Sequence, residues 1–193
     1  MNIEIIKQFK KSIKLIYDFQ AKNAGLIYHV WDHTEQVTEA AENILKRNSK
    51  LYSDENLLLI KIASIGHDLG NIIRRDEHEF LSSEYAKSVL PYFGFDKSSI
   101  DIVSDLILAT RFPHKPSTEL QKIICDADMS LMGQDNWLEK IEGYRIELGI
   151  TDKNKWYLMQ KGFLENHRWH TQEAHQLYND QKIRNLNNLT RLL

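Results

Sequence analysis

The sequence predicts an all-α protein, and three observations support this prediction. Apolar residues recur at helical spacing along the whole 193-residue chain, strong period-two alternation of apolar and polar residues is absent, and only three prolines interrupt the pattern. The apolar content of 42% and the charged content of 27% are ordinary for a globular protein. Because no repeat, linker or low-complexity tract divides the chain, we expect a single domain over residues 1–193.

An apolar stripe marks each of the first two helices. The first helix is expected over about residues 2–23, with Gly25 as its terminator. His29, His33 and Val37 then share one face of the second helix at helical spacing. This second helix is therefore expected to turn both histidines toward the interior.

Glycine, proline and capping residues bound the third and fourth helices. The third is expected over about residues 54–68, with His67 on its apolar face and Gly70 as its terminator. Asp76 can cap the fourth helix, and Pro91 blocks its extension.

The second half of the chain continues the helical pattern. Thr118-Glu119-Leu120-Gln121 has the form of a capping box for a helix that reaches Asp128. The other helices are expected over about 97–110, 134–148, 152–166, 170–178 and 180–192.

Charge and cysteine content restrict the partners and the compartment. The formal net charge of −2 provides no overall attraction to nucleic acid or to an anionic membrane surface, so neither partner is expected. Cys125 is the single cysteine, which excludes an intramolecular disulfide, and we expect it to be a small buried apolar residue. Lys7, Lys10 and Lys11 interrupt the apolar runs near the N-terminus, so neither a signal peptide nor a membrane span is predicted. We expect a cytoplasmic protein.

Four residues carry most of the chemical information: His33, the adjacent His67 and Asp68, and Asp128. Their helical spacing predicts that three helices each direct a metal-binding group inward. Imidazole nitrogens and carboxylate oxygens suit divalent metals, and a cation would offset the several kcal/mol that unpartnered buried carboxylates cost. The alternative is that each is a core polar group with satisfied hydrogen bonds.

The order of these four residues resembles the HD-domain superfamily of metal-dependent phosphohydrolases. The match spans about residues 26–130, and residues 131–193 would form a C-terminal helical extension. The resemblance implies an HD-type helical bundle in which the four residues ligate a divalent ion, with Asp68 able to bridge a second ion. Mn, Mg, Zn, Fe, Co and Ni are all candidates, at one or two ions per chain.

Tyr28 and His29, followed by His33, also resemble the signature of cyclic-nucleotide phosphodiesterases within this superfamily. The resemblance implies that His29 is the general acid that protonates the leaving oxygen, although Val30 stands where those enzymes carry asparagine. One helical turn separates His29 from His33, which would let it reach a group bound at the metal. The alternative is a core histidine, or one that supports a metal ligand.

Two residues downstream of the His-Asp pair are further candidates. Glu79 resembles the carboxylate that orients the attacking water in HD phosphohydrolases. The alternative is an exposed glutamate that favours the helix dipole. His78 is a candidate ligand for a second metal ion.

Four basic residues are weak candidates for substrate binding: Arg74, Arg111, His114 and His167. Arg111 could offer two parallel hydrogen bonds to phosphate. The alternative for the arginines is a solvated surface charge, and for His167 it is helix capping and packing. Asp126 lies away from the metal-facing side of its helix and is a candidate for orienting a histidine.

These residues together predict an enzyme, a metal-dependent phosphohydrolase of phosphodiesterase or of phosphomonoesterase and nucleotidase type. It would hydrolyse a phosphate ester or anhydride in a nucleotide or another small phosphorylated metabolite. Two alternatives remain open. One is a di-iron HD-type oxygenase, for which His78 and His114 would supply further ligands, and the other is a non-catalytic nucleotide-sensing module. The intact ligand set disfavours the sensor, and a homo-oligomer is compatible with each function.

Overall fold

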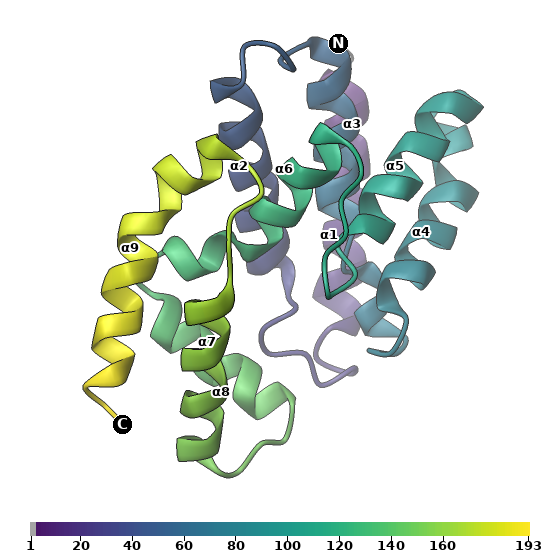
Figure 1. The fold of residues 1–193 in the computed structure, drawn as a ribbon. Coiled ribbons are helices and arrows are strands. Elements are labelled where there is room, and N and C mark those ends of the chain that lie inside the picture. The colour runs from purple at the N-terminus through teal and green to yellow at the C-terminus, as the bar shows by residue number, and fades with distance from the viewer. Residues whose placement is uncertain (1–2) are drawn as a thin grey trace.

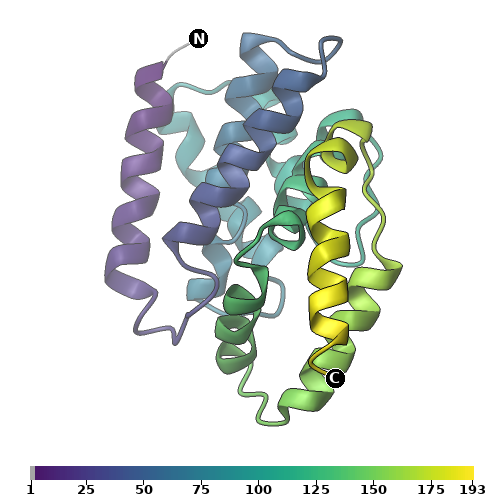
Figure 2. The ribbon, with the colours of Figure 1, turned by 90° about the vertical axis from the view of Figure 1, so that its left-hand side faces the viewer.

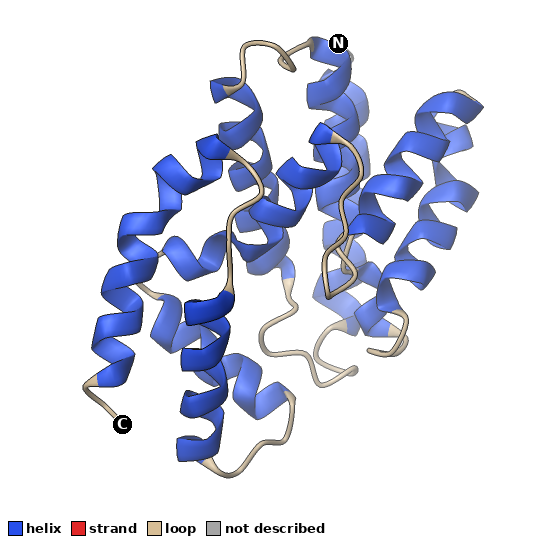
Figure 3. Cartoon of the chain, in the orientation of Figure 1, coloured by secondary structure: helices blue, strands red, loops and turns tan. Residues whose placement is uncertain are grey.

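In the computed structural model, which describes residues 3–193, every regular element is a helix, as predicted (Figure 3). The α-helices labelled in Figure 1 are α1 (Ile3–Gln20), α2 (Trp31–Arg47), α3 (Asp54–Gly66), α4 (His78–Val89), α5 (Lys97–Ala109), α6 (Glu119–Asp128), α7 (Trp137–Glu147), α8 (Lys153–Asn166) and α9 (Gln172–Thr190). The short 3-10 helices that follow α3, α4 and α6 are η1 (Leu69–Ile72), η2 (Leu90–Phe93) and η3 (Met129–Gly133). None of the described helices has both the length and the apolarity that a membrane span requires.

The larger hydrophobic core lies among the first six α-helices. α2 packs along α3 and α6, α3 packs along α1 and α5, and α5 packs along α4. Ile44, Ile60, Ile107 and Ile123 are fully buried there, and each contributes about 1.5–3 kcal/mol of hydrophobic stabilisation. This packing brings the C-terminal ends of α3 and α6 close to the start of α2.

A second, smaller core is formed by η3, α7, α8 and α9. Trp156 is buried in it together with Trp137, Leu164 and Leu189. α9 contacts α7 and α8 on one side and α2 and α6 on the other, so it connects the two cores (Figure 2). α9 is therefore packed directly against α2 and α6, which carry the predicted metal ligands His33 and Asp128.

Three local features differ from the sequence prediction. His29 lies in the bend before α2, because the residue that precedes this helix has an extended backbone. Asp76 does not cap α4, which begins directly after Glu77, a residue with left-handed backbone (φ 64°) and no side-chain capping bond. The helices predicted over 170–178 and 180–192 form one continuous helix, α9, because neither glycine nor proline separates them.

Side-chain caps fix the starts of α6 and α9. Thr118 and Gln121 form the predicted capping box of α6. The Asp126 carboxylate accepts hydrogen bonds from the backbone N–H groups of His170 and Thr171, both at 2.8 Å, and from the Thr171 hydroxyl at 2.7 Å. Asp126 therefore anchors the start of α9 and does not orient a histidine ring.

The contact between η3 and α9 requires a glycine. A Cβ atom at Gly133 would lie 2.3 Å from Tyr178 Cβ and 2.7 Å from Tyr178 Cα, so the backbones approach too closely for a side chain. Next to this contact, Asn185 Nδ2 donates hydrogen bonds to the carbonyl oxygens of Met132 at 2.9 Å and Gln134 at 2.7 Å. These contacts fix α9 against the segment that follows the predicted ligand Asp128.

We expect Gly133→Ala to lower the free energy of unfolding by about 1–3 kcal/mol, because the added methyl group forces η3 and α9 apart. Gly162→Ala is a matched control, since a Cβ atom there meets no heavy atom within 4 Å in the middle of α8. The control should be more stable than wild type by up to about 1 kcal/mol. Denaturant unfolding followed by circular dichroism measures both values. A Gly133→Ala variant as stable as wild type would show that this packing tolerates a side chain.

Candidate metal centre

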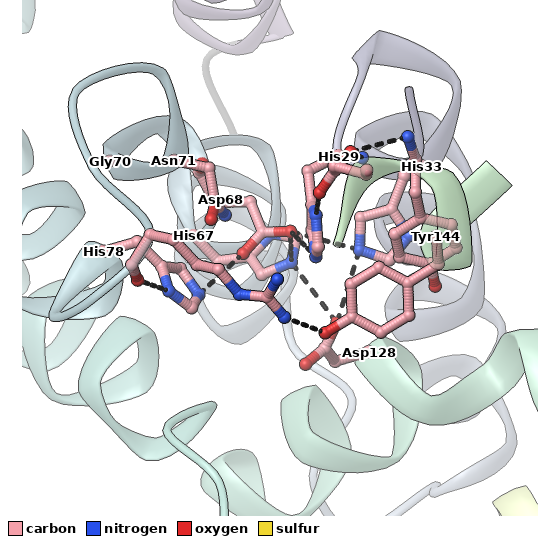
Figure 4. A network of polar contacts seen from close by, with 12 residues as sticks. His29, His33, His67, Asp68, Gly70, Asn71, His78, Asp128 and Tyr144 are labelled. Carbon is pink, nitrogen blue, oxygen red and sulfur yellow. Dashed lines mark hydrogen bonds and ion pairs between the residues drawn. The ribbon is translucent and has the colours of Figure 1, made fainter. Parts of the chain in front are cut away.

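The four predicted ligands meet where α2, α3 and α6 converge (Figure 4). His33 lies in the first turn of α2, His67 and Asp68 directly follow α3, and Asp128 is the last residue of α6. His33 Nε2 lies 3.2 Å from Asp68 Oδ2 and 3.4 Å from Asp128 Oδ1. His67 Nε2 lies 3.3 Å and 3.4 Å from the same two oxygens. The structure thus brings together residues that are up to 95 positions apart in the sequence, between 33 and 128.

A tight turn positions His67 and Asp68. α3 ends one residue before this pair, and η1 begins directly after it. Gly70, predicted as the terminator of α3, lies inside η1, where a Cβ atom would be 2.2 Å from the carbonyl oxygen of His78. The N–H of Gly70 donates a hydrogen bond to Ser82 Oγ at 2.9 Å. The absence of a side chain at Gly70 therefore lets the start of α4 lie close to the His-Asp pair.

The donor atoms of the cluster suit a divalent ion. His67 Nδ1 lies 2.8 Å from the carbonyl oxygen of Ser64, so Nδ1 carries a proton and Nε2 is directed to the cluster. Nε2 is buried and has no hydrogen-bond partner among residues 3–193. Nitrogen and oxygen ligands at about 2.0–2.2 Å from one ion are roughly 3–3.5 Å apart, which agrees with the separations in the cluster. The buried cluster is therefore consistent with a metal site.

Mutual charge interactions shift the pKa values of all four groups. Burial opposes the charged form of His33 and His67, but the neighbouring carboxylates outweigh burial and raise both histidine pKa values. Burial also opposes ionisation of Asp68 and Asp128, but the neighbouring histidines outweigh burial and lower both carboxyl pKa values. The protons that this network holds on the histidines compete with a metal ion for the same nitrogen lone pairs.

His29 reaches the cluster from the bend before α2, not from the helix face on which it was predicted. Its Nε2 lies 4.0 Å from Asp68 Oδ2, and its Nδ1 makes a short hydrogen bond with Glu147. Glu147 Oε2 also accepts hydrogen bonds from the backbone N–H groups of Ile27 at 2.8 Å, Tyr28 at 2.7 Å and His29 at 3.1 Å. The end of α7 thus holds the bend in place.

His78 lies on the other side of Asp68 from His33 (Figure 4), and Glu79 follows it in the first turn of α4. His78 Nε2 is 3.1 Å from Asp68 Oδ1 and 3.5 Å from Glu79 Oε1. Burial opposes protonation of His78, but Asp68 outweighs burial and raises the pKa of this histidine. Glu79 is in the first turn of α4, as predicted, and it is buried and close to the cluster, which argues against the alternative of an exposed glutamate.

A cavity of about 440 Å³ opens from the cluster. Its polar end includes His29, His33, Asp68, Glu79 and Asp128. Much of the remaining lining consists of apolar and aromatic side chains of η3, α7 and α8, which include Leu131, Met132, Trp137, Tyr144, Trp156 and Phe163. This combination of an apolar wall and a few converging polar groups is typical of a small-molecule site.

Arg75 is the single lysine or arginine among the described residues that line the cavity. Its guanidinium group lies 5.2 Å from the centre of the Tyr144 ring and also contacts the Tyr144 hydroxyl. This contact places a positive charge in the cavity lining beside Tyr144. A guanidinium group in this position can donate two hydrogen bonds to a phosphate group.

The structure does not bring the predicted substrate-binding residues to this cavity. Arg74 has a 56% exposed side chain that pairs with Glu77. Arg111 is exposed, and His114 and His167 pack among nearby aromatic rings. Burial, with smaller effects of neighbouring positive charges, lowers the pKa of His167 to about 3. None of the four is among the cavity-lining residues of the described chain.

The sequence pattern did not mark Tyr144 or Glu147, although both lie beside His29. The Tyr144 ring contacts the His29 ring edge-on, with 5.2 Å between ring centres. The contact between His29 and Glu147 spans 118 residues, and no local motif indicates it. The sequence shows only that Glu147 lies near the end of a predicted helix, which does not indicate a contact with His29.

Comparisons with known proteins agree with this geometry. The HD domain family model matches residues 30–132. No curated protein matches significantly. A predicted HD superfamily hydrolase from an uncultured Thermotogales bacterium has a similar structure, with a TM-score of 0.64, 23% identity, and coverage of 98% of this chain and 89% of that one. Bacillus subtilis YpgQ in complex with ADP is also similar, with a TM-score of 0.68, 19% identity, and coverage of 97% and 95%. At these identities the two structures establish a shared fold.

We expect His67→Ala to reduce bound divalent metal by at least about tenfold, because it removes a buried nitrogen donor that no other described group satisfies. His175→Ala is the matched control, since this exposed histidine lies on α9 away from the cluster. Elemental analysis after metal loading and desalting gives the metal content of each variant. Equal metal content in wild type and His67→Ala would remove His67 from the ligand set.

Proposed function

The chain belongs to the HD domain family, and we propose that it is a metal-dependent phosphohydrolase that acts on a nucleotide or another small phosphorylated metabolite. The observation that carries this proposal is the buried His-Asp cluster in a cavity that is also lined by aromatic side chains. We also propose that residues 1–193 act as one unit. The HD core over about 26–130 supplies the cluster, and the extension over about 131–193 supplies most of the apolar wall.

The proposed ligands are His33, His67, Asp68 and Asp128. His78 and the second oxygen of Asp68 are available to a further ion, because His78 Nε2 lies 3.1 Å from Asp68 Oδ1. Mn, Mg, Zn, Fe, Co and Ni are all compatible with nitrogen and carboxylate donors. A divalent ion in such a site polarises a phosphoryl oxygen and lowers the pKa of a bound water.

The protein groups around the cluster divide the acid and base roles. Glu79 and Asp68 can accept hydrogen bonds from the attacking water and so orient it toward phosphorus. His29 Nε2 faces the cluster and can give its proton to the departing oxygen as the P–O bond breaks. Arg75, which also lines the cavity, can balance negative charge on the phosphoryl oxygens.

The cavity wall supports a substrate with a flat organic group. Trp137, Tyr144, Trp156 and Phe163 offer aromatic surfaces within the same cavity as the polar cluster. A nucleotide base can stack on such surfaces while its phosphate lies at the polar end. The structurally similar YpgQ was solved in complex with ADP, which supports a nucleotide as the class of ligand.

The two other functions that the sequence allows have less structural support. A di-iron oxygenase would need further histidine ligands, and His114 lies outside the cavity lining of the described chain. A non-catalytic nucleotide sensor would have no need of the buried Glu79 next to His78. Neither alternative uses as many of the groups that converge on the cavity.

Hydrolysis is tested by incubating the metal-loaded protein with nucleoside mono-, di- and triphosphates, cyclic nucleotides and sugar phosphates. We expect phosphate or pyrophosphate release for at least one class, and the mass of the product identifies the broken bond. Asp68→Asn should abolish turnover, since it removes a charge from the centre of the cluster. Nucleotide binding without turnover by a metal-loaded protein would favour the sensor.

We expect His29→Ala to lower kcat by roughly a hundredfold or more on substrates with poor leaving groups, because no proton reaches the departing oxygen. The activity of this variant on a nitrophenyl ester should fall much less, since that leaving group departs without a proton. Metal content should stay near that of wild type. Equal losses on both kinds of substrate would exclude the acid role, and loss of metal would instead make His29 a ligand.

A further inference from the structure

Glu147 is a buried carboxylate with no role in the acid and base steps proposed above. It is the last residue of α7, and it lies beyond residues 30–132, which the family model matches. Its side chain is only 7% exposed. Burying a carboxylate so completely is costly unless hydrogen bonds satisfy its oxygens. The partners of those oxygens therefore indicate what Glu147 does.

The two oxygens of Glu147 have different partners. Oε2 accepts hydrogen bonds from three successive backbone N–H groups, those of Ile27, Tyr28 and His29, at 2.7–3.1 Å. Oε1 contacts the ring nitrogen Nδ1 of His29. One oxygen thus fixes the backbone of the bend, and the other contacts the imidazole ring.

The contact at Oε1 determines where His29 holds its proton. An ionised carboxylate can only accept hydrogen bonds, so Nδ1 must be the donor. Burial opposes ionisation of Glu147, but the contacts with His29 and the backbone N–H groups outweigh burial and lower its pKa to about 2. With the Nδ1 proton directed to Glu147, Nε2 is the ring nitrogen left to face Asp68, whose Oδ2 lies 4.0 Å away.

Aromatic neighbours hold the His29 ring in this orientation. Tyr28 and Tyr144 contact it edge-on, with ring centres 4.8 Å and 5.2 Å from the centre of the imidazole. Tyr144 lies on α7, one turn before Glu147. The same helix therefore supplies both a hydrogen-bond partner for Nδ1 and a wall for the ring.

We propose that Glu147 is a positioning residue for the acid step: it fixes the His29 ring with its proton on Nδ1, so that Nε2 faces the reacting group. This inference rests on the proposed hydrolytic function, in which His29 Nε2–H gives its proton to the departing oxygen. The acid is the ring with a proton on both nitrogens: as the P–O bond breaks, the Nε2 proton passes to the departing oxygen, and the ring becomes neutral and keeps the Nδ1 proton on the hydrogen bond to Glu147. Glu147 itself neither gains nor loses a proton in this step.

Glu147→Gln separates this role from simple support of the bend. The three backbone N–H groups need an acceptor, so they orient the amide oxygen of the glutamine toward themselves. The amide NH2 group then faces His29 Nδ1, where it can only donate. The neutral ring must therefore move its proton from Nδ1 to Nε2, while the backbone of the bend keeps its hydrogen bonds.

Glu142→Gln is the matched control on the same helix. Glu142 is a half-buried carboxylate that pairs with Arg145 at 3.2 Å and Lys153 at 3.6 Å, and it is not among the residues that line the cavity. Its replacement removes a charge from α7 without changing the contact with His29. Any general effect of charge loss on this helix should appear in both variants.

The direct test is nitrogen-15 NMR of the His29 ring, without substrate, in wild type, Glu147→Gln and Glu142→Gln. We expect the neutral ring to carry its proton on Nδ1 in wild type and Glu142→Gln, and on Nε2 in Glu147→Gln. A wild-type ring with its proton on Nε2 overturns the proposal, and this result needs no variant to fold. A ring with the same tautomer in wild type and Glu147→Gln also overturns it.

Turnover provides the second measurement. We expect Glu147→Gln to lower kcat by roughly ten- to a hundredfold on a poor leaving group, with KM within about twofold of wild type and a much smaller loss on a nitrophenyl ester. Equal losses on both substrates would reduce Glu147 to structural support and overturn the proposal. If the wild type hydrolyses no phosphate compound, the proposed function fails. The NMR result still decides whether Glu147 sets the tautomer of His29.

Discussion

The close burial of two carboxylates, Asp68 and Asp128, is the constraint on which the rest of the site depends. Two like charges in the interior destabilise a fold unless positive groups or a cation lie between them. His33 and His67 meet this requirement, with each Nε2 within 3.2–3.4 Å of both carboxylates. This arrangement needs the start of α2 and the ends of α3 and α6 at one point, and the isoleucine-rich core holds the three helices there.

The helices after Asp128 complete the site from outside the segment that the family model matches. α7 and α8 supply most of the aromatic wall of the cavity, and Glu147 at the end of α7 holds the bend that contains His29. α9 fixes these helices against α2 and α6, in part through the close approach of Gly133 to Tyr178. The segment that the family model matches thus provides the charged cluster. The C-terminal helices provide the surface that the organic group of a ligand would contact.

Local apolar periodicity predicted the helical fold and the inward direction of the four cluster residues. Their convergence was predicted from their order along the chain, which resembles that of the HD superfamily. Prediction from the sequence failed where a contact between distant segments determines the local structure. His29 was predicted on a helix face, but three hydrogen bonds to Glu147, about 118–120 residues away, hold its bend. The sequence leaves an exposed first-turn glutamate as an alternative for Glu79, but α4 packs against η1 and the Glu79 side chain is buried. Periodicity carries no information about either contact.

The cluster can exchange protons for metal without changing its net charge. Without an ion, the raised histidine pKa values and the lowered carboxyl pKa values favour protonated histidines beside ionised carboxylates, so that the charges offset one another. A divalent ion brings two positive charges and needs neutral imidazole donors, so it would replace the two protons charge for charge. A buried site that is neutral in both forms avoids the large cost of an uncompensated interior charge. The fold is therefore compatible with both forms, and the ligands can be in place before the ion arrives.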